Sequence, residues 1–355
     1  MKTDMTQGKP VKVLLGFTIP VFIGNVFQQF YNMVDAVVVG KFVGTKALAA
    51  VGSTGTIIFL IIGFLLGLTA GFTVLTAQKY GAGKMDEMRQ TVGNALILTA
   101  LVSAVMTAVS MTGMHALLKF MHTPDDIFKD AYAYVMIICG GIFAQALYNI
   151  LASILRALGN SKVPLYFLIL SAMLNIVLDL VFVVVFRMSV QGVGIATILS
   201  QFISAVLITF CLMRTNECYR LKWSKVRFHK MLLIRIIQIG VPAGLQSVMY
   251  NIANIIIQSN VNLLGSNTMA AYTAYSKIDA VFWMIMNAFG VSVSTFAGQN
   301  FGAGKLDRVR KSMKICLGMA LGASIGLSVI LHFFGRYVYM LFTTDAQVIE
   351  IGMQI

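Results

Sequence analysis

Charged residues are scarce in this chain of 355 residues. Asp, Glu, Lys and Arg together make up 11% of it, whereas a soluble domain has about 25%. Apolar residues make up 58%, and the mean hydropathy is +0.83. One core cannot hide that much apolar surface, which argues against a water-soluble enzyme and against a disordered chain. The four cysteines include no C-x-x-C pair and exclude a disulfide scaffold.

Long uninterrupted apolar runs predict membrane-spanning helices. A porin-type barrel would instead show short segments of alternating hydropathy, and each spanning helix needs about 20 apolar residues. We expect nine spans and the beginning of a tenth near residue 347. The nine are at 13–38, 48–77, 91–115, 131–154, 163–186, 190–213, 234–262, 271–297 and 315–341.

The net charge of +14 is distributed unevenly along the chain. Most lysines and arginines precede the first span or lie in the loops after the second, fourth, sixth and eighth spans. Since positive charge marks the cytoplasmic side, these loops and the N-terminus should be cytoplasmic, in a bacterial-type inner (plasma) membrane. The basic excess therefore orients the chain in lipid, and no nucleic-acid partner is needed to explain it.

Two parts of the sequence resemble each other at an offset of 221 residues. Gly44 matches Gly265, Thr123 matches Thr344, and the run Gly81–Lys84 matches Gly302–Lys305. Such a register predicts a duplication, and an even number of spans per copy makes the two copies parallel. The fold class is therefore all-α and polytopic, with two parallel repeats of six transmembrane helices. The expected units are a first six-helix bundle (1–213), a basic cytoplasmic linker (214–233) and a second bundle (234–355).

The register also predicts that the second bundle is incomplete. Ile355 falls opposite Tyr134, just inside the fourth span of the first copy. The second bundle would thus hold about three helices and the start of a fourth. On this logic the intact, C-terminally longer product has twelve spans and about 430–450 residues.

The two Gly-Ala-Gly-Lys runs do not form a nucleotide P-loop. That motif requires Ser or Thr after the lysine, but Met85 and Leu306 stand there. A tight glycine turn between two spans is the expected structure. Pro20 and Pro242, which match with one gap, are candidate hinges in the spans that open each repeat.

Three acidic residues lie within predicted spans, where an ionised side chain is costly and marks a polar cavity or a partner. Asp279 has Lys277 nearby, and a local ion pair would explain it. Asp35 has no cation within a helical turn. It shares one helix face with three polar residues. They are Asn25, Gln28 and Asn32.

The fifth span carries a second pair, Asn175 and Asp179, four residues apart on one face. Thr197 in the sixth span could meet them. Oxygen ligands of this kind suit a hard cation such as Na⁺, and neighbouring desolvated carboxylates can hold a proton. Contact between helices without any transport role is the alternative.

The seventh span has its own polar face but no acid. Its members repeat every four residues and, with those of the first span, predict a substrate cavity. They are Gln246, Tyr250, Asn254 and Gln258. Coupling chemistry is accordingly expected in the first copy, at Asp35, Asn175, Asp179 and Thr197.

The sequence resembles the multidrug and toxic compound extrusion (MATE) family of secondary transporters over essentially its whole length. The resemblance rests on the two glycine turns and on three further motifs. These are Pro20…Asp35…Gly44, then Arg156-Ala157-Leu158-Gly159 with Pro164, and Asn175…Asp179 followed by Gly192-Val193-Gly194-Ile195-Ala196-Thr197.

The resemblance implies a monomeric antiporter that exports organic cations, drugs or other amphipathic compounds in exchange for H⁺ or Na⁺, without another cofactor. In the DinF-like branch the coupling residues would be Asp35, Asn175, Asp179 and Thr197. The NorM-like branch uses a Glu in the seventh helix, which this chain lacks.

Two alternatives remain at this point. A lipid-linked oligosaccharide flippase shares the repeat plan, but it would favour cationic cavity residues, and the stripes here are neutral and acidic. A membrane enzyme would need a convergent base and a metal or nucleophile. The four histidines show no such arrangement within a span, although His122 stands near Asp125 and Asp126.

Overall fold

The computed structural model describes residues 4–121, 123–215, 220, 228–264, 266–340 and 345–354. His122, Gly265 and Thr344 lie outside these ranges. The helices in chain order are α1 (Pro10–Val38), α2 (Thr45–Gly81), α3 (Met85–Phe120), α4 (Asp125–Gly140), α5 (Ile142–Ala157), α6 (Lys162–Leu180), α7 (Ser189–Arg214), α8 (Lys230–Leu263), α9 (Ser266–Gly302), α10 (Leu306–Met340) and α11 (Ala346–Gln354). Among the described residues, eight helices are long and apolar enough to cross a membrane, and α4 with α5 would make a ninth.

The structure differs from the predicted spans at the fourth span and at several helix ends. The fourth span is broken at Gly141, where α4 and α5 meet at 47°. Helix α8 begins four residues before the predicted span, within the last part of the expected linker, and α10 begins at Leu306 rather than at 315. The last two differences arise because polar and basic residues near a membrane surface can continue a helix beyond its apolar stretch.

Two helices end in a π-helical turn. Val39–Val43 (η1) continues α1, and Val181–Val185 (η2) continues α6. Each turn begins within four residues after a buried aspartate, Asp35 in α1 and Asp179 in α6. Such turns are rare and occur frequently at functional sites.

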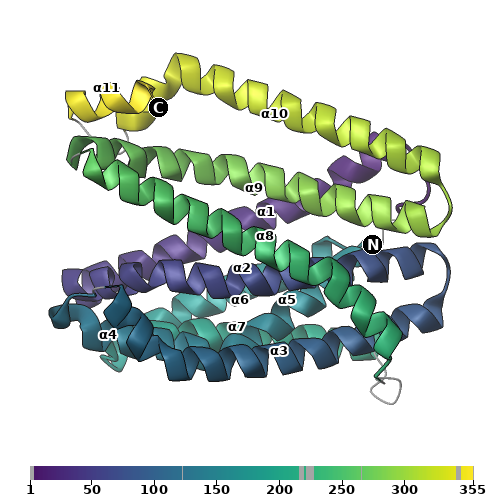
Figure 1. Cartoon of the computed structure of the whole chain (residues 1–355), viewed down its shortest axis with the longest axis horizontal. Coiled ribbons are helices and arrows are strands. Elements are labelled where there is room, and N and C mark those ends of the chain that lie inside the picture. The colour runs from purple at the N-terminus through teal and green to yellow at the C-terminus, as the bar shows by residue number, and fades with distance from the viewer. Residues whose placement is uncertain are drawn as a thin grey trace.

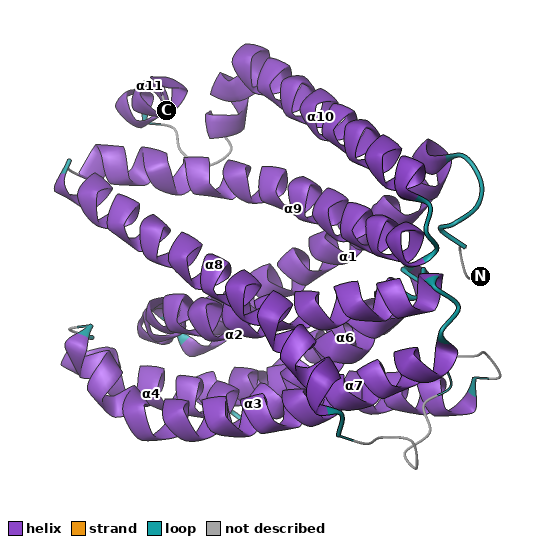
Figure 2. Cartoon of the chain, turned by 45° about the vertical axis from the view of Figure 1, so that its right-hand side comes forward, coloured by secondary structure: helices purple, strands orange, loops and turns teal. Residues whose placement is uncertain are grey.

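The helices form two groups that are joined by two crossing helices (Figures 1 and 2). Helices α2 to α7 make one group, and α9 to α11 make the other. Helix α1 begins beside α9 and α10 and ends within the first group, while α8 begins beside α2 and α3 and ends beside α9 (Figure 1). Their first halves therefore pack on the opposite group: Leu14 and Phe17 contact Phe296, and Ile236 joins the core of the first group.

Glycines allow α2 and α8 to approach very closely. A Cβ atom added to Gly67 would lie 2.3 Å from Gly244 Cα, and one added to Gly71 would lie 2.7 Å from the backbone nitrogen of Gly240. Small residues at four-residue spacing are typical of tight helix contacts in membranes. The matching crossing of α1 and α9 is polar, because the hydroxyls of Thr18 and Ser292 lie 2.8 Å apart there.

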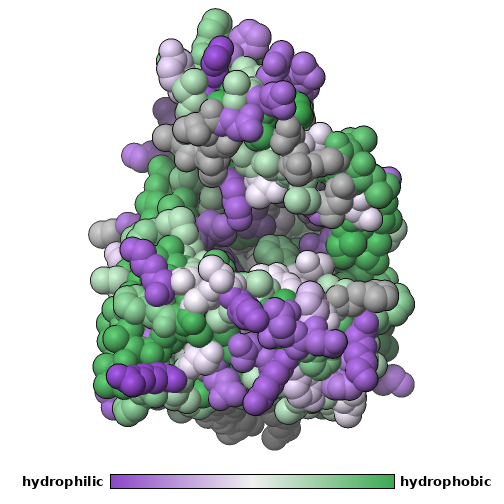
Figure 3. Space-filling view, turned by 90° about the vertical axis from the view of Figure 1, so that its left-hand side faces the viewer, coloured by the Kyte–Doolittle hydropathy of each residue, from purple (hydrophilic) through white to green (hydrophobic). Residues whose placement is uncertain are grey.

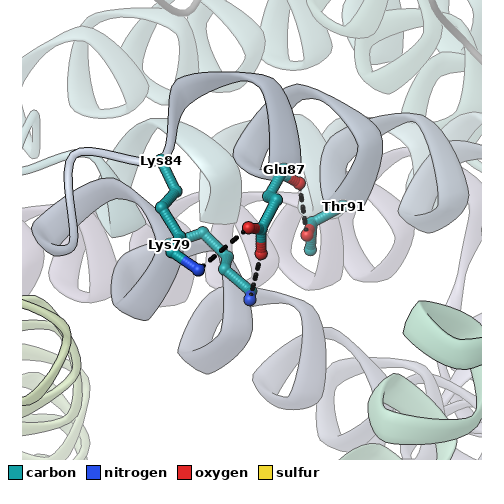
Figure 4. Close-up of polar contacts among 4 residues, drawn as sticks. All are labelled: Lys79, Lys84, Glu87 and Thr91. Carbon is teal, nitrogen blue, oxygen red and sulfur yellow. Dashed lines mark hydrogen bonds and ion pairs between the residues drawn. The ribbon is translucent and has the colours of Figure 1, made fainter.

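The two Gly-Ala-Gly-Lys runs form equivalent tight turns, as the sequence predicts. Gly83 and Gly304 have φ angles of +71° and +73°, a conformation that glycine adopts without strain. In the first turn, Glu87 pairs with Lys79 and, at 3.0 Å, with Lys84 (Figure 4). These turns lie at what we call the basic end of the molecule, together with the N-terminal segment (Figure 1).

Candidate functional site

The candidate coupling site lies inside the first group of helices, where α1 packs against α6 and α7 follows α6. Asp35 is 9% exposed, Asp179 is 0% exposed, and Asn175, one turn before it, is 1% exposed. The side chains of Asp179 and Thr197 are within hydrogen-bonding reach of the Asp35 carboxylate. The structure thus brings Asp35, Asp179 and Thr197 together from three different helices, and Asn175 lies one turn from Asp179 on α6.

Several buried polar atoms of this cluster lack hydrogen-bond partners within the described residues. Asp35 Oδ1, both Asp179 oxygens and both polar atoms of the Asn175 amide have no partner. Thr197 cannot supply a proton to Asp35, because its hydroxyl donates to the Val193 carbonyl at 2.9 Å. Two ionised carboxylates are acceptors only, so the pair requires a proton or a cation between its oxygens. Carboxylate and amide oxygens fit either H⁺ or a hard cation such as Na⁺.

Three further residues surround this cluster and were not among those predicted. Gln201 is 4% exposed, its Oε1 has no hydrogen-bond partner, and it lies one turn after Thr197. Tyr31, one turn before Asp35, is within reach of Gln201. The four-residue spacings Tyr31–Asp35 and Thr197–Gln201 could have indicated both. Tyr134 also lies near Asp35 and Asp179, but only the packing of α4 against α7 brings it there.

The polar stripe of α1 does not act as one cavity surface. Asn25 is half-buried and donates to the Met284 carbonyl of α9 at 3.1 Å, whereas Gln28 and Asn32 are exposed and Asp35 is buried within the first group. Asp35 is therefore enclosed by the first group, whereas Gln28 and Asn32, which are predicted to line the cavity, are accessible. The stripe is wide enough for its two edges to meet different neighbours, since positions 25 and 35 differ by about 80° around a helix.

The polar face of α8 is more uniformly accessible. Gln246 and Tyr250 are exposed, and Asn254 and Gln258 are partly buried. The Tyr250 ring meets the Trp283 indole of α9 at 4.8 Å in an edge-to-face contact. Prolines Pro20 and Pro242 lie inside α1 and α8, respectively, which are the two helices that cross between the groups.

Asp279 does not form the local ion pair that its neighbour Lys277 suggests. No ion pair within the described residues joins them; the Asp279 carboxylate instead lies within hydrogen-bonding reach of the Trp283 side chain, one turn away. Asp279 and Trp283 are both partly accessible, and Tyr275 lies nearby on the same helix. The sequence interpretation fails because Lys277, two residues away, points to another side of the helix.

The end of the molecule opposite the basic end is hollowed (Figure 3). Hydrophilic side chains lie within the hollow, while the outer flanks are largely hydrophobic (Figure 3). Within the described residues, no group of three or more His, Cys, Asp or Glu side chains could hold a metal ion. A polar hollow between two helix groups with apolar flanks is the form expected of a transport pathway in lipid.

Comparison with known families supplies the identity. The MatE family model matches residues 20–181 and 242–355. The chain belongs to the MatE family. The two matched segments begin at Pro20 and Pro242 and correspond to the two repeats. Membership of this family makes the protein an all-helical, integral membrane transporter and not an enzyme.

Two curated MatE relatives cover nearly the whole chain. The probable multidrug resistance protein YpnP of Bacillus subtilis is 29% identical over 99% of this chain and 78% of its own length. An FAD transporter of Shewanella oneidensis is 24% identical over 96% of this chain and 76% of its own. A solved MOP superfamily transporter from Pyrococcus furiosus, 23% identical, superimposes with a TM-score of 0.91 over 99% of this chain and 79% of that one.

Proposed function

We propose that this MatE protein is a monomeric antiporter that exports organic cations or other amphipathic small molecules in exchange for H⁺ or Na⁺. One observation carries the proposal: two buried aspartates, Asp35 and Asp179, lie within hydrogen-bonding reach of each other, and Asp35 Oδ1 and both Asp179 oxygens have no donor among the described residues. Buried polar groups are normally hydrogen-bonded, and ionisable groups inside a membrane mark ion pathways. An exchangeable proton or cation would satisfy these oxygens.

The orientation follows from the distribution of charge. We place the basic end, which carries the N-terminus and the two glycine turns, in the cytoplasm of a bacterial-type plasma membrane. The hollow in Figure 3 then opens to the outside. In this state substrate leaves towards the exterior, and a cation entering from the same side reaches the Asp35–Asp179 cluster.

Coupling in this proposal works through helix α1. Because Asp35 lies on α1 and Asp179 on α6, a proton or cation between them draws the two helices together. Helix α1 also contacts α9 through Asn25 and contains Pro20, so a change at Asp35 can reach the other group. One charge moving across 100 mV releases about 2.3 kcal/mol, which corresponds to a nearly 50-fold concentration of substrate.

Substrate recognition in this proposal includes an acidic aromatic site on the second group. Tyr250 and Trp283 meet edge to face, and the Asp279 carboxylate lies within hydrogen-bonding reach of Trp283. An organic cation gains about 0.5–2 kcal/mol over an aromatic ring, and a carboxylate adds charge attraction. We therefore expect Asp279→Asn to raise the KM for ethidium about tenfold while the response to the cation gradient is kept. An unchanged KM would remove Asp279 from the substrate site.

The cation site makes a separate prediction at Asp179. Asp179→Asn should shift the H⁺ or Na⁺ dependence of transport, and Thr197→Val should do so more weakly, because the hydroxyl of Thr197 is only a neighbour of Asp35. If the cluster merely holds helices together, both variants should lower thermal stability and leave the cation dependence unaltered. Transport and melting temperature measured on the same preparations distinguish these outcomes.

The proposed function is tested with purified protein in proteoliposomes loaded with ethidium. We expect ethidium to leave the vesicles against its own concentration gradient when an inward gradient of H⁺ or of Na⁺, each imposed alone, drives the exchange. Parallel vesicles loaded with FAD or with a lipid-linked oligosaccharide test anionic substrates and the flippase alternative. Movement of either of those substrates without ethidium transport would overturn the proposed substrate class.

A further inference from the structure

The N-terminal segment is held at the basic end by the second repeat. Asn300 Nδ2 donates to the Met5 carbonyl at 2.9 Å, and Lys305 Nζ donates to the Thr6 carbonyl at 2.8 Å. Arg308 donates to the carbonyls of Met5, Gln7 and Gly8 at 2.9–3.2 Å. Every carbonyl from Met5 to Gly8 therefore accepts a hydrogen bond from α9, α10 or the turn between them.

The same segment is anchored by an apolar side chain. Met5 is 0% exposed and packs in a cluster with Leu14, Phe17 and Phe296. The Arg308 guanidinium lies 5.4 Å from the centre of the Phe296 ring. Arg308 therefore contacts both the backbone of the segment and the aromatic ring against which Met5 packs. A terminal segment is usually poorly ordered unless it is tied down in this way.

The first repeat lacks an equivalent of this arrangement at the matching positions. Under the offset of 221, Asn300 matches Lys79, and Arg308 matches Glu87. In the first repeat, Glu87 binds the two lysines of its own turn (Figure 4). In the second repeat, Arg308 Nε binds Asn300 Oδ1 at 2.9 Å and its remaining donors face the N-terminal segment. The exchange of a carboxylate for a guanidinium thus opens the second turn to a backbone ligand.

The two helix groups also touch directly at this end. A Cβ atom added to Gly81 would lie 1.9 Å from the Gln299 carbonyl oxygen, and one added to Gly302 would lie 1.9 Å from the Gln78 carbonyl oxygen. Gln299 Nε2 further donates to the Ala157 carbonyl at 2.7 Å. The basic end is therefore closed in this structure, in contrast to the hollowed opposite end.

We propose that residues 4–9 form a latch that stabilises the state closed at the basic end. The segment leads directly into α1, whose first half lies on α9, so binding of the segment by Asn300, Lys305 and Arg308 holds α1 against α9. Opening of the basic end separates α1 from α9 and requires release of the segment. This inference rests on the antiporter function proposed above, which requires the molecule to open to each side of the membrane in turn, and it names a contact that favours one of those two states.

The test measures how readily a water-soluble reagent reaches the contact between α1 and α9. In a variant with its native cysteines replaced, Ser292→Cys provides a reporter at a position that is 0% exposed and beside Thr18. We expect Met5→Ala and Arg308→Ala each to raise the rate of labelling by a water-soluble maleimide at least about tenfold. This is the scale of one buried apolar side chain for Met5 and of one charge-assisted hydrogen bond for Arg308. Arg310→Ala is the matched control, since its side chain is largely exposed.

The double variant distinguishes a latch from two local defects. If Met5 and Arg308 act through the same contact, Met5→Ala with Arg308→Ala should label no faster than the faster single variant. Met5→Ala leaves α9 and α10 intact, which protects the test against misfolding of the Arg308 variant. The latch would be overturned if the single variants were labelled no faster than Arg310→Ala. It would also be overturned if the effects of the two single variants multiplied in the double variant. Because labelling needs neither gradient nor substrate, a failure of ethidium transport alone would reject the proposed function and leave the latch standing.

Discussion

Replacement of Asp35 by Asn is expected to abolish gradient-driven transport, with a loss of at least about a hundredfold. The amide keeps the size and polarity of the side chain but cannot hold an exchangeable proton or balance a cation. Asp179 would then remain as a single buried carboxylate within reach of a neutral neighbour. Since Asp35 lies on α1, which connects the two helix groups, loss of its charge removes the link between ion binding and movement of the groups.

The measurement compares ethidium efflux from proteoliposomes under an imposed ion gradient. Asp307→Asn is the matched control, because the Asp307 side chain is fully exposed at the basic end. Equal folded yield and equal melting temperature show that the Asp35 variant is intact. Efflux by Asp35→Asn at the rate of the control would exclude Asp35 from coupling.

The largest effect on stability is expected at the crossing of α2 and α8. Gly67→Ala places a Cβ atom 2.3 Å from Gly244 Cα, and neither backbone can move without displacing the whole crossing. Overpacking of this kind costs about 3 kcal/mol. We expect the melting temperature and the yield of folded protein to fall clearly, with transport falling in proportion to the folded protein.

Gly55→Ala in the same helix is the matched control, since a Cβ atom there would have no atom within 4 Å. A glycine within a helix costs about 1 kcal/mol relative to alanine, so this variant should be neutral or slightly more stable. If both alanine variants behave alike in a thermal melt, the two helices do not approach as closely as described.

The helices and the acidic residues of the candidate site were predictable from the sequence. Apolar length defines the spans, and an aspartate in an apolar run such as Asp35 is conspicuous because its burial is costly. The offset between the two glycine turns predicted both the duplication and the equivalent turns that the structure contains. Each of these signals is local or periodic, which is why a single sequence carries them.

Contacts between distant helices were not predictable in the same way. Tyr134 reaches the aspartates only because α4 packs on α7, and no spacing within α4 points to it. The break at Gly141 and the π-helical turns depend on tertiary packing that overrides an apolar run. The binding of Met5 to Arg308 joins residues at nearly opposite ends of the chain, and only the crossing of α1 over to α9 brings them together.

The most direct test of coupling by Asp35 and Asp179 is the ion movement that an outward substrate gradient drives. Proteoliposomes loaded with ethidium are diluted into ethidium-free medium, and uptake of H⁺ or of ²²Na⁺ is followed with no ion gradient imposed. An antiporter must exchange the two in a fixed ratio, so we predict ion uptake that follows ethidium loss in the wild-type protein and is absent in Asp35→Asn. Ethidium loss by the wild-type protein without uptake of either ion, or equal uptake by Asp35→Asn, would contradict the account.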